Sequence, residues 1–175
     1  MKSVFIVLSD TGSALTRAIK FFTNKPYNHA SISLDEDLRT LYSFGRKKPN
    51  NPLIGGFVEE ELNEGTYKRF PNTRCMVLKV EVEDEVYDKL TYMIQGFVEN
   101  KEAYHYNFIG LFGVLLNKPI LRKNYYFCSS FVADVSMQSG IIKEIESPHI
   151  VRPHDFESLL QQSEVVYEGY MRDYK

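Results

Sequence analysis

Two residues of this sequence have side chains that can perform nucleophilic chemistry as a pair, Cys128 and His29. A thiolate is a strong nucleophile, and a histidine within hydrogen-bond reach can take up the thiol proton. Cys128 lies in the segment Phe127-Cys128-Ser129-Ser130-Phe131, and His29 lies in Tyr27-Asn28-His29-Ala30-Ser31-Ile32-Ser33-Leu34. Because the two segments are far apart in the chain, only the folded structure can bring them together.

The element that carries Cys128 is predicted to be a helix. Apolar residues recur at Phe127, Phe131, Val132 and Val135, which is the spacing of one buried helix face, and Gly140 is a C-terminal stop. Cys128 would then lie in the first turn, where backbone N–H groups and the helix dipole favour a thiolate. The alternative is that Cys128 only fills the core, as free cysteines often do.

The element that carries His29 is predicted to be the first strand of a β-hairpin. Alternation over residues 29–34 and 38–44 favours two strands, joined by a loop at residues 35–37. If Leu34 pairs with Leu38, His29 lies opposite Ser43. The small residues Ser31 and Ser33 would share the face of His29 and would let a helix approach closely. The alternative is a structural histidine at a strand end.

The remaining pattern predicts one α+β domain over residues 1–175, without repeats or linkers. Residues 108–116 are apolar and predict a buried helix or loop, or alternatively a contact with an acyl chain. We expect further strands at 4–8, 74–83 and 165–167, a short edge strand at 57–62, a turn followed by a helix over 9–22, further helices at 84–97 and 152–160, and a loop at 45–56.

Composition excludes several classes of protein. Apolar residues make up 43% and charged residues 25%, as in ordinary globular proteins, and the net charge of −2 gives no reason to expect nucleic acid. No run approaches the ~18 apolar residues of a membrane span, and the N-terminus lacks a secretory pattern. Two cysteines are too few for a disulfide framework, and they do not have the spacing of zinc ligands. The sequence also has no phosphate-binding loop, so we expect neither a metal nor a cofactor. We therefore expect a cytoplasmic protein without stable membrane insertion.

Three segments resemble a known family. The His29 segment quoted above, then Leu41-Tyr42-Ser43-Phe44-Gly45-Arg46, then Phe127-Cys128-Ser129-Ser130-Phe131-Val132-Ala133, resemble the circularly permuted branch of the NlpC/P60 papain-like superfamily. That branch includes YiiX-like proteins and is similar to lecithin:retinol acyltransferases. In it, a histidine strand precedes a cysteine helix. Residues 9–22 and 153–156 also resemble the family.

The resemblance implies a papain-like fold in which an antiparallel sheet packs against the helix that carries the cysteine. It implies that Cys128 is the nucleophile and His29 the general base and then acid. Ser43 would take the third, polar position, where the family usually has His, Glu, Asn or Gln, so the serine departs from the pattern. A serine hydroxyl can orient the imidazole but offers no charge to stabilise an imidazolium. Tyr27 or Tyr126 would line the cleft, and the N–H of Cys128 would help to bind the oxyanion.

The function that this resemblance implies is that of a bacterial cysteine hydrolase or acyltransferase. It would cleave an amide bond, for example in a peptide derived from the cell wall, through a thioester acyl-enzyme. One alternative is a lipid acyl hydrolase or acyltransferase that holds a chain against residues 108–116. The other is a non-catalytic binding module on the same fold. This alternative stays open because position 43 is a serine.

Overall fold

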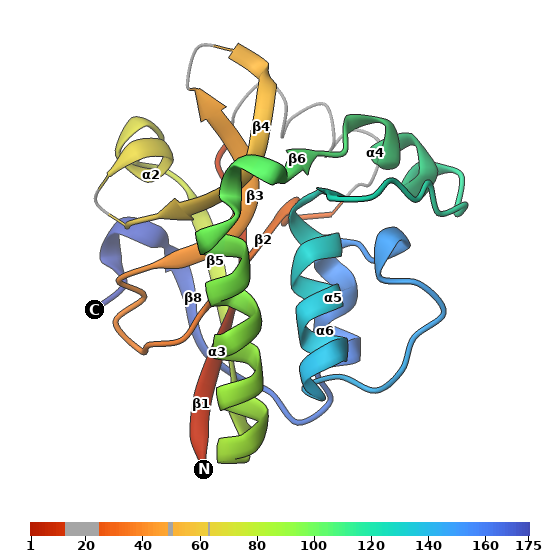
Figure 1. The fold of residues 1–175 in the computed structure, drawn as a ribbon. Coiled ribbons are helices and arrows are strands. Elements are labelled where there is room, and N and C mark those ends of the chain that lie inside the picture. The colour runs from red at the N-terminus through yellow and green to blue at the C-terminus, as the bar shows by residue number, and fades with distance from the viewer. Residues whose placement is uncertain (13–24, 49–50, 63) are drawn as a thin grey trace.

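A six-stranded antiparallel sheet organises the protein (Figure 1). The computed structural model describes residues 1–12, 25–48, 51–62 and 64–175. The strand order is β4-β3-β2-β1-β5-β8, and two short strands, β6 and β7, pair in parallel beside it. The bounds are β1 (Lys2–Asp10), β2 (His29–Ser33), β3 (Leu41–Lys48), β4 (Asn51–Glu60), β5 (Arg74–Val82), β6 (His105–Tyr106), β7 (Tyr125–Tyr126) and β8 (Glu164–Tyr170).

Two helices cover one face of the sheet and build the larger core. In Figure 1, α3 (Asp84–Glu99) and α5 (Cys128–Ser139) run side by side across it. Phe97 from α3 and Phe131 from α5 pack against Phe44 and Phe57 of the sheet, with ring centroids 5.3 to 6.2 Å apart. Rings at these separations gain attraction beyond the burial of their area. The cluster therefore fixes α5, and with it Cys128, against the strands.

Smaller elements cover the other face. Tyr67 from α2 (Gly65–Arg69) and Met171 from the 3-10 turn Met171–Asp173 pack there with Cys75 and Val77 of β5. Cys75 is completely buried in this second core, and burial raises the pKa of its thiol to about 12. In the described residues, the remaining helical segments are α4 (Phe108–Leu115), α6 (Phe156–Leu159), and the 3-10 turns Lys101–Ala103, Pro148–Ile150 and Pro153–Asp155.

Most of the predicted elements are present, and the α+β class is confirmed. The strands predicted near residues 4–8, 29–34, 74–83 and 165–167 are found, as are the helices that begin at Asp84 and Cys128. Of residues 108–116, Phe108–Leu115 form α4; Val114 is buried but Ile109 is exposed, so this helix is only partly buried. Of the turn and helix predicted over 9–22, residues 9–10 of the turn belong to β1, and residues 13–22 lie outside the described residues.

The predicted hairpin register is wrong by two residues. It required Ile32 to lie opposite Thr40, whereas Ile32 pairs with Tyr42. The cause is Leu38, whose backbone has a positive φ of 51° and whose side chain is buried in the second core, so β3 begins only at Leu41. Because side chains alternate with a period of two, this shift leaves Ser43 on the face that was predicted for it.

The loop predicted at residues 45–56 is also largely wrong. Gly45 pairs with Gly56 and Arg46 pairs with Gly55, so β3 and β4 extend through most of this segment. Glycine and proline weaken a strand, but β4 is at the sheet edge, where the missing N–H of a proline is tolerated. This longer hairpin matters for the site, because it places both Arg46 and Glu60 on strands.

Candidate active site

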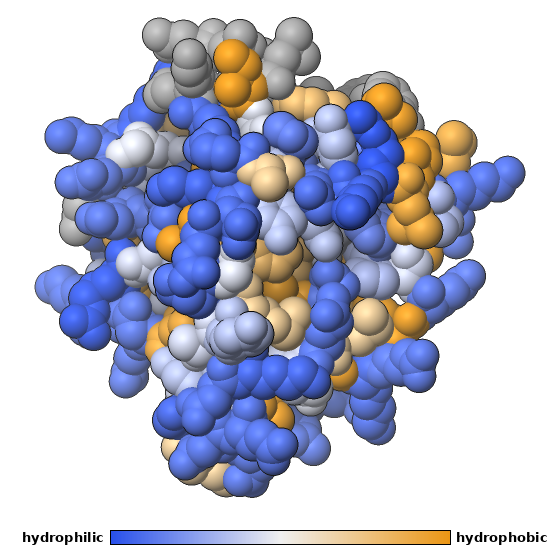
Figure 2. All heavy atoms as spheres, in the orientation of Figure 1, coloured by the Kyte–Doolittle hydropathy of each residue, from blue (hydrophilic) through white to orange (hydrophobic). Residues whose placement is uncertain are grey.

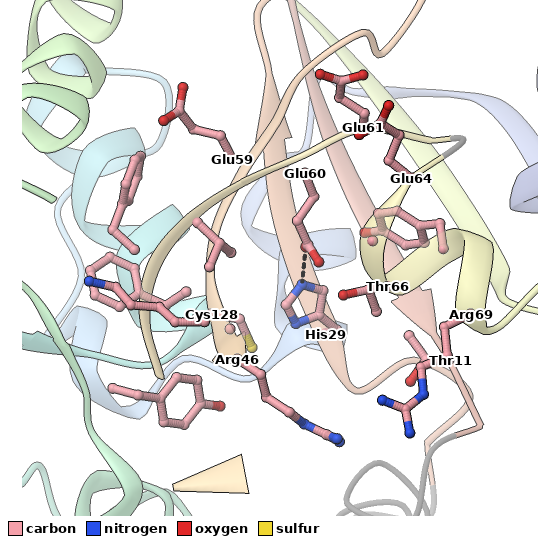
Figure 3. Close-up of a pocket in the computed structure, with 18 of the residues that line it drawn as sticks. Thr11, His29, Arg46, Glu59, Glu60, Glu61, Glu64, Thr66, Arg69 and Cys128 are labelled. Carbon is pink, nitrogen blue, oxygen red and sulfur yellow. Dashed lines mark ion pairs between the residues drawn. The ribbon is translucent and has the colours of Figure 1, made fainter. Parts of the chain in front are cut away.

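Cys128 and His29 lie in the wall of one cavity with a volume of about 580 Å³ (Figure 3). His29 is the first residue of β2 and Cys128 the first residue of α5, so the reactive side chains come from the ends of two rigid elements. The other lining residues come mainly from β3, β4, α2 and the segment around β6, and they include Arg46, Glu59, Glu60, Glu61, Glu64, Arg69, Tyr106 and Phe108.

Hydrogen bonds fix the start of α5. The N–H of Phe127 donates to Ser130 Oγ over 2.9 Å, and Ser130 Oγ donates to the carbonyl of Phe127 over 2.8 Å. Ser129 Oγ donates to the carbonyl of Val151 over 2.8 Å, which ties the first turn to the segment before α6. These bonds satisfy groups that a helix terminus otherwise leaves without partners. They hold Cys128 at the tip of the helix.

The surroundings of Cys128 favour its thiolate. The residue is only 5% exposed, and burial by itself would raise the pKa of the thiol. The charge of His29 and a hydrogen bond with it outweigh burial and lower the pKa below its ordinary value of 9.0. Hydrogen bonds from the backbone N–H groups of Ala30 and Ser129 act in the same direction. The pKa of the Cys128 thiol is thus lowered, whereas that of the Cys75 thiol is raised.

The imidazole of His29 is held between two elements. In Figure 3, one ring nitrogen points toward Cys128, while Nε2 points away from it and toward Glu60. Nε2 lies 3.3 Å from Ser43 Oγ and 3.8 Å from Glu60 Oε2. Ser43 Oγ donates its proton to the carbonyl of Ala30 over 2.8 Å, so its oxygen faces Nε2 as an acceptor. This arrangement favours the tautomer with the proton on Nε2, which leaves the other nitrogen to accept the thiol proton.

The same surroundings favour a protonated His29 beside the thiolate. Burial alone would lower the pKa of His29 below 6.5, but the Cys128 thiolate, its hydrogen bond and the Glu60 carboxylate together raise it. A raised pKa for the histidine and a lowered pKa for the cysteine both widen the pH range in which the two groups are charged. The pair is therefore suited to exist as thiolate and imidazolium.

Glu60 is the site residue that the sequence analysis missed. The segment at 57–62 was interpreted only as an edge strand, and nothing in the local pattern marks Glu60 among three consecutive glutamates. The structure pairs Glu60 with Leu41 across the hairpin, two positions from the pair of Ser43 with Val58. The two side chains therefore share one face of the hairpin, and both reach His29. Glu60 supplies the charge that Ser43 lacks.

Two predicted cleft residues are corrected by the structure. Tyr27 and Tyr126 are not among the residues that line the cavity. The Tyr27 hydroxyl donates to Glu168 over 2.7 Å, and the Tyr126 hydroxyl donates to Asp134 over 3.2 Å. Their positions next to the two motifs led to the prediction, but both rings join the core cluster. Tyr106 and Phe108 line the cavity instead.

The packing of α5 also differs from the expectation. Ser31 and Ser33 pair with Val7 and Phe5, whose side chains lie in the second core, so they face away from α5. Ala30 and Ile32 are the β2 residues that pack with α5 in the larger core. Close approach therefore depends on Ala30, whose N–H also reaches the sulfur of Cys128.

The described residues hold no group of three or more His, Cys, Asp or Glu side chains that is arranged to bind a metal ion. Both cysteines are free thiols. Within the described part of the chain, no helix combines the length and the apolar character needed to cross a bilayer.

The site is thus a buried cysteine–histidine pair with a serine and a glutamate on the far side of the imidazole. Comparisons of the chain with family models, with curated proteins and with solved structures gave no match. The geometry of the site therefore carries the functional argument.

Proposed function

We propose that the protein is a cysteine hydrolase or acyltransferase that cleaves an amide or ester bond through a thioester acyl-enzyme. The observation that carries this proposal is the thiol of Cys128 at a helix tip, paired with a histidine whose other nitrogen meets Ser43 and Glu60. A nucleophile, a base and an orienting group are the three parts that such chemistry needs. The order of histidine strand and cysteine helix supports a permuted papain-like fold.

In the proposed reaction, the thiolate of Cys128 attacks the carbonyl carbon, and the carbonyl π electrons move onto oxygen. The backbone N–H of Cys128 is the donor that we assign to this oxyanion. As the intermediate collapses, the bond to the leaving group breaks and the imidazolium of His29 gives its proton to that group. A water molecule or a second acceptor then attacks the thioester, with the neutral imidazole of His29 as the base, and the thiol is regenerated.

The proposal is tested with p-nitrophenyl acetate, an activated ester that needs no specific recognition. We expect a burst of about one nitrophenol per chain and an acetyl group on Cys128, detected by mass spectrometry of the peptides. Cys128→Ala should abolish the burst, whereas Cys75→Ala should keep it. A wild-type protein that is acetylated no faster than Cys128→Ala would instead support a non-catalytic binding module.

Glu60 is proposed to orient His29 and to stabilise its imidazolium. Because the carboxylate raises the pKa of His29, Glu60→Gln should lower that pKa and reduce the share of the thiolate–imidazolium form. We expect acetylation of Cys128 at neutral pH to slow about tenfold, which corresponds to about 1.4 kcal/mol. The pKa is measured from the pH dependence of the His29 imidazole resonances in the NMR spectrum.

Glu59→Gln is the matched control for this substitution. Glu59 is the neighbouring residue on β4, and its carboxylate lies 3.5 Å from Lys101 Nζ rather than beside His29. The control removes the same charge from the same strand. An unchanged pKa of His29 in Glu60→Gln, or an equal fall in both variants, would show that Glu60 does not act on the imidazole directly.

A specific observation also favours a second candidate function, the hydrolysis or transfer of a lipid acyl chain. Phe108, at the start of α4, lines the cavity, and Ile109, Leu116 and Leu121 are 52 to 70% exposed nearby in sequence. Figure 2 shows apolar atoms gathered over α4 on this face. A site that holds a chain should react faster with p-nitrophenyl octanoate than with the acetate, whereas a peptide-directed site should not.

A further inference from the structure

Two arginines line the cavity on one side of the reactive pair. Arg46 comes from β3 and Arg69 is the last residue of α2. In Figure 3, both guanidinium groups extend to the side of Cys128 and His29 that is opposite Glu59, Glu61 and Glu64. Glu59 is paired with Lys101, so the cavity has a basic side at the two arginines and an acidic side at Glu61 and Glu64, with the thiol and the imidazole between them.

Arg46 acts electrostatically on the same small region as the thiol. Gly55 lets Tyr106 approach β4 closely, since a Cβ atom at Gly55 would lie 2.8 Å from Tyr106 Cβ. Burial raises the pKa of the Tyr106 hydroxyl well above its usual value; a charge on Cys128 raises it further, and the charge of Arg46 lowers it. The charges of Cys128 and Arg46 thus both act on the Tyr106 hydroxyl. A small substrate at the thiol therefore also lies in the electric field of Arg46.

The arginines can bind a ligand even when they already have a partner within the protein. A guanidinium carries five N–H donors and pairs with carboxylates in a fork, so one that already has a partner can still donate to a second. The charges along the cavity disfavour a dianion more than a monoanion. Among the described lining residues, four cations (Arg46, Lys47, Arg69, Lys101) face five carboxylates (Glu59, Glu60, Glu61, Glu64, Glu102), so a phosphate dianion meets more repulsion than a carboxylate.

We propose that the site selects acyl substrates that carry a carboxylate near the scissile carbonyl, bound on the side of Arg46 and Arg69. This inference rests on the proposed function of Cys128. The acidic side of the cavity repels the same carboxylate, so the two sides together orient the substrate in one direction across the thiol.

Two alkylating reagents of nearly equal size test the inference. Iodoacetate carries a carboxylate and iodoacetamide a neutral amide in its place. With either reagent the sulfur of Cys128 forms a bond to the methylene carbon, and the carbon–iodine bond breaks with release of iodide. The measured quantity is the rate of Cys128 labelling by iodoacetate divided by the rate by iodoacetamide. This ratio cancels any general change in the reactivity of the thiolate.

In the wild-type protein, we expect a ratio at least about tenfold above that of the free thiol N-acetylcysteine, and a decrease with added salt. The imidazolium of His29 contributes to this excess in every variant. Arg46→Gln and Arg69→Gln should each lower the ratio severalfold, and the double variant should lower it further. Arg122→Gln is the matched control, because Arg122 lies over the ring of Tyr125 and does not line the cavity.

An unchanged ratio in Arg46→Gln, Arg69→Gln and the double variant would overturn the carboxylate selectivity. That result would leave the proposed function intact, provided that iodoacetamide still labels Cys128 well ahead of Cys75. Equal, slow labelling of both cysteines by iodoacetamide would overturn the proposed function, and the carboxylate selectivity with it. Thermal unfolding of each variant is monitored by circular dichroism. It identifies any variant in which the ratio of labelling rates falls because the protein is misfolded.

Discussion

At mildly acidic pH, iodoacetamide will label Cys128 at least about a thousandfold faster than Cys75, because only the thiolate reacts. Burial and the charge of Glu168 raise the pKa of Cys75 to about 12, whereas His29 lowers that of Cys128 below 9.0 against the opposing effect of burial. Cys75 is also fully buried, while Cys128 lines the cavity. The rates are read from the two cysteine peptides by mass spectrometry over a time course.

The control for this experiment is the unfolded chain. In concentrated urea both thiols return to an ordinary cysteine pKa, and their labelling rates should become equal. A large rate difference that disappears on unfolding is therefore a property of the native structure. Comparable slow labelling of the two cysteines in the native protein would contradict the proposed thiolate at position 128.

The second large effect is expected from His29→Ala. Without the imidazole, burial dominates and the pKa of Cys128 rises, so labelling at mildly acidic pH should slow by about a hundredfold. The remaining N–H donors of Ala30 and Ser129 still favour the thiolate, so labelling should recover as the pH is raised. The pH profile of the labelling rate tests both the slower labelling at acidic pH and its recovery at higher pH. In His29→Ala, the fall in rate on the acidic side of the profile should move to higher pH.

His154→Ala is the matched control, because it removes the same side chain from a different place. His154 lies 3.5 Å from Asp155 and does not line the cavity. We expect its labelling profile to overlay that of the wild type. If the two histidine variants behave alike, His29 is not the base. A profile that does not recover at high pH in His29→Ala would indicate lost structure rather than a lost proton acceptor.

Cys128, His29 and Ser43 could be predicted because they follow local patterns. Helical spacing predicted Cys128 at the start of α5, and alternation predicted His29 on a strand. Ser43 was placed beside His29 through an incorrect register, but an error of two residues does not change the face of a strand. Tyr27 and Tyr126 were misplaced because closeness in sequence to a motif does not determine where a side chain points.

The amino-acid sequence by itself determined the α+β class, most of the strands and helices, and the positions of His29 on a strand and Cys128 on a helix. These follow from apolar periodicity and from turn residues, which act over a few positions of the chain. Tertiary structure alone decided that Glu60 reaches His29, that Ala30 rather than Ser31 faces α5, and that Arg46 and Arg69 line one cavity. These relations depend on strand order, register and side-chain packing between distant segments, and no local pattern contains them.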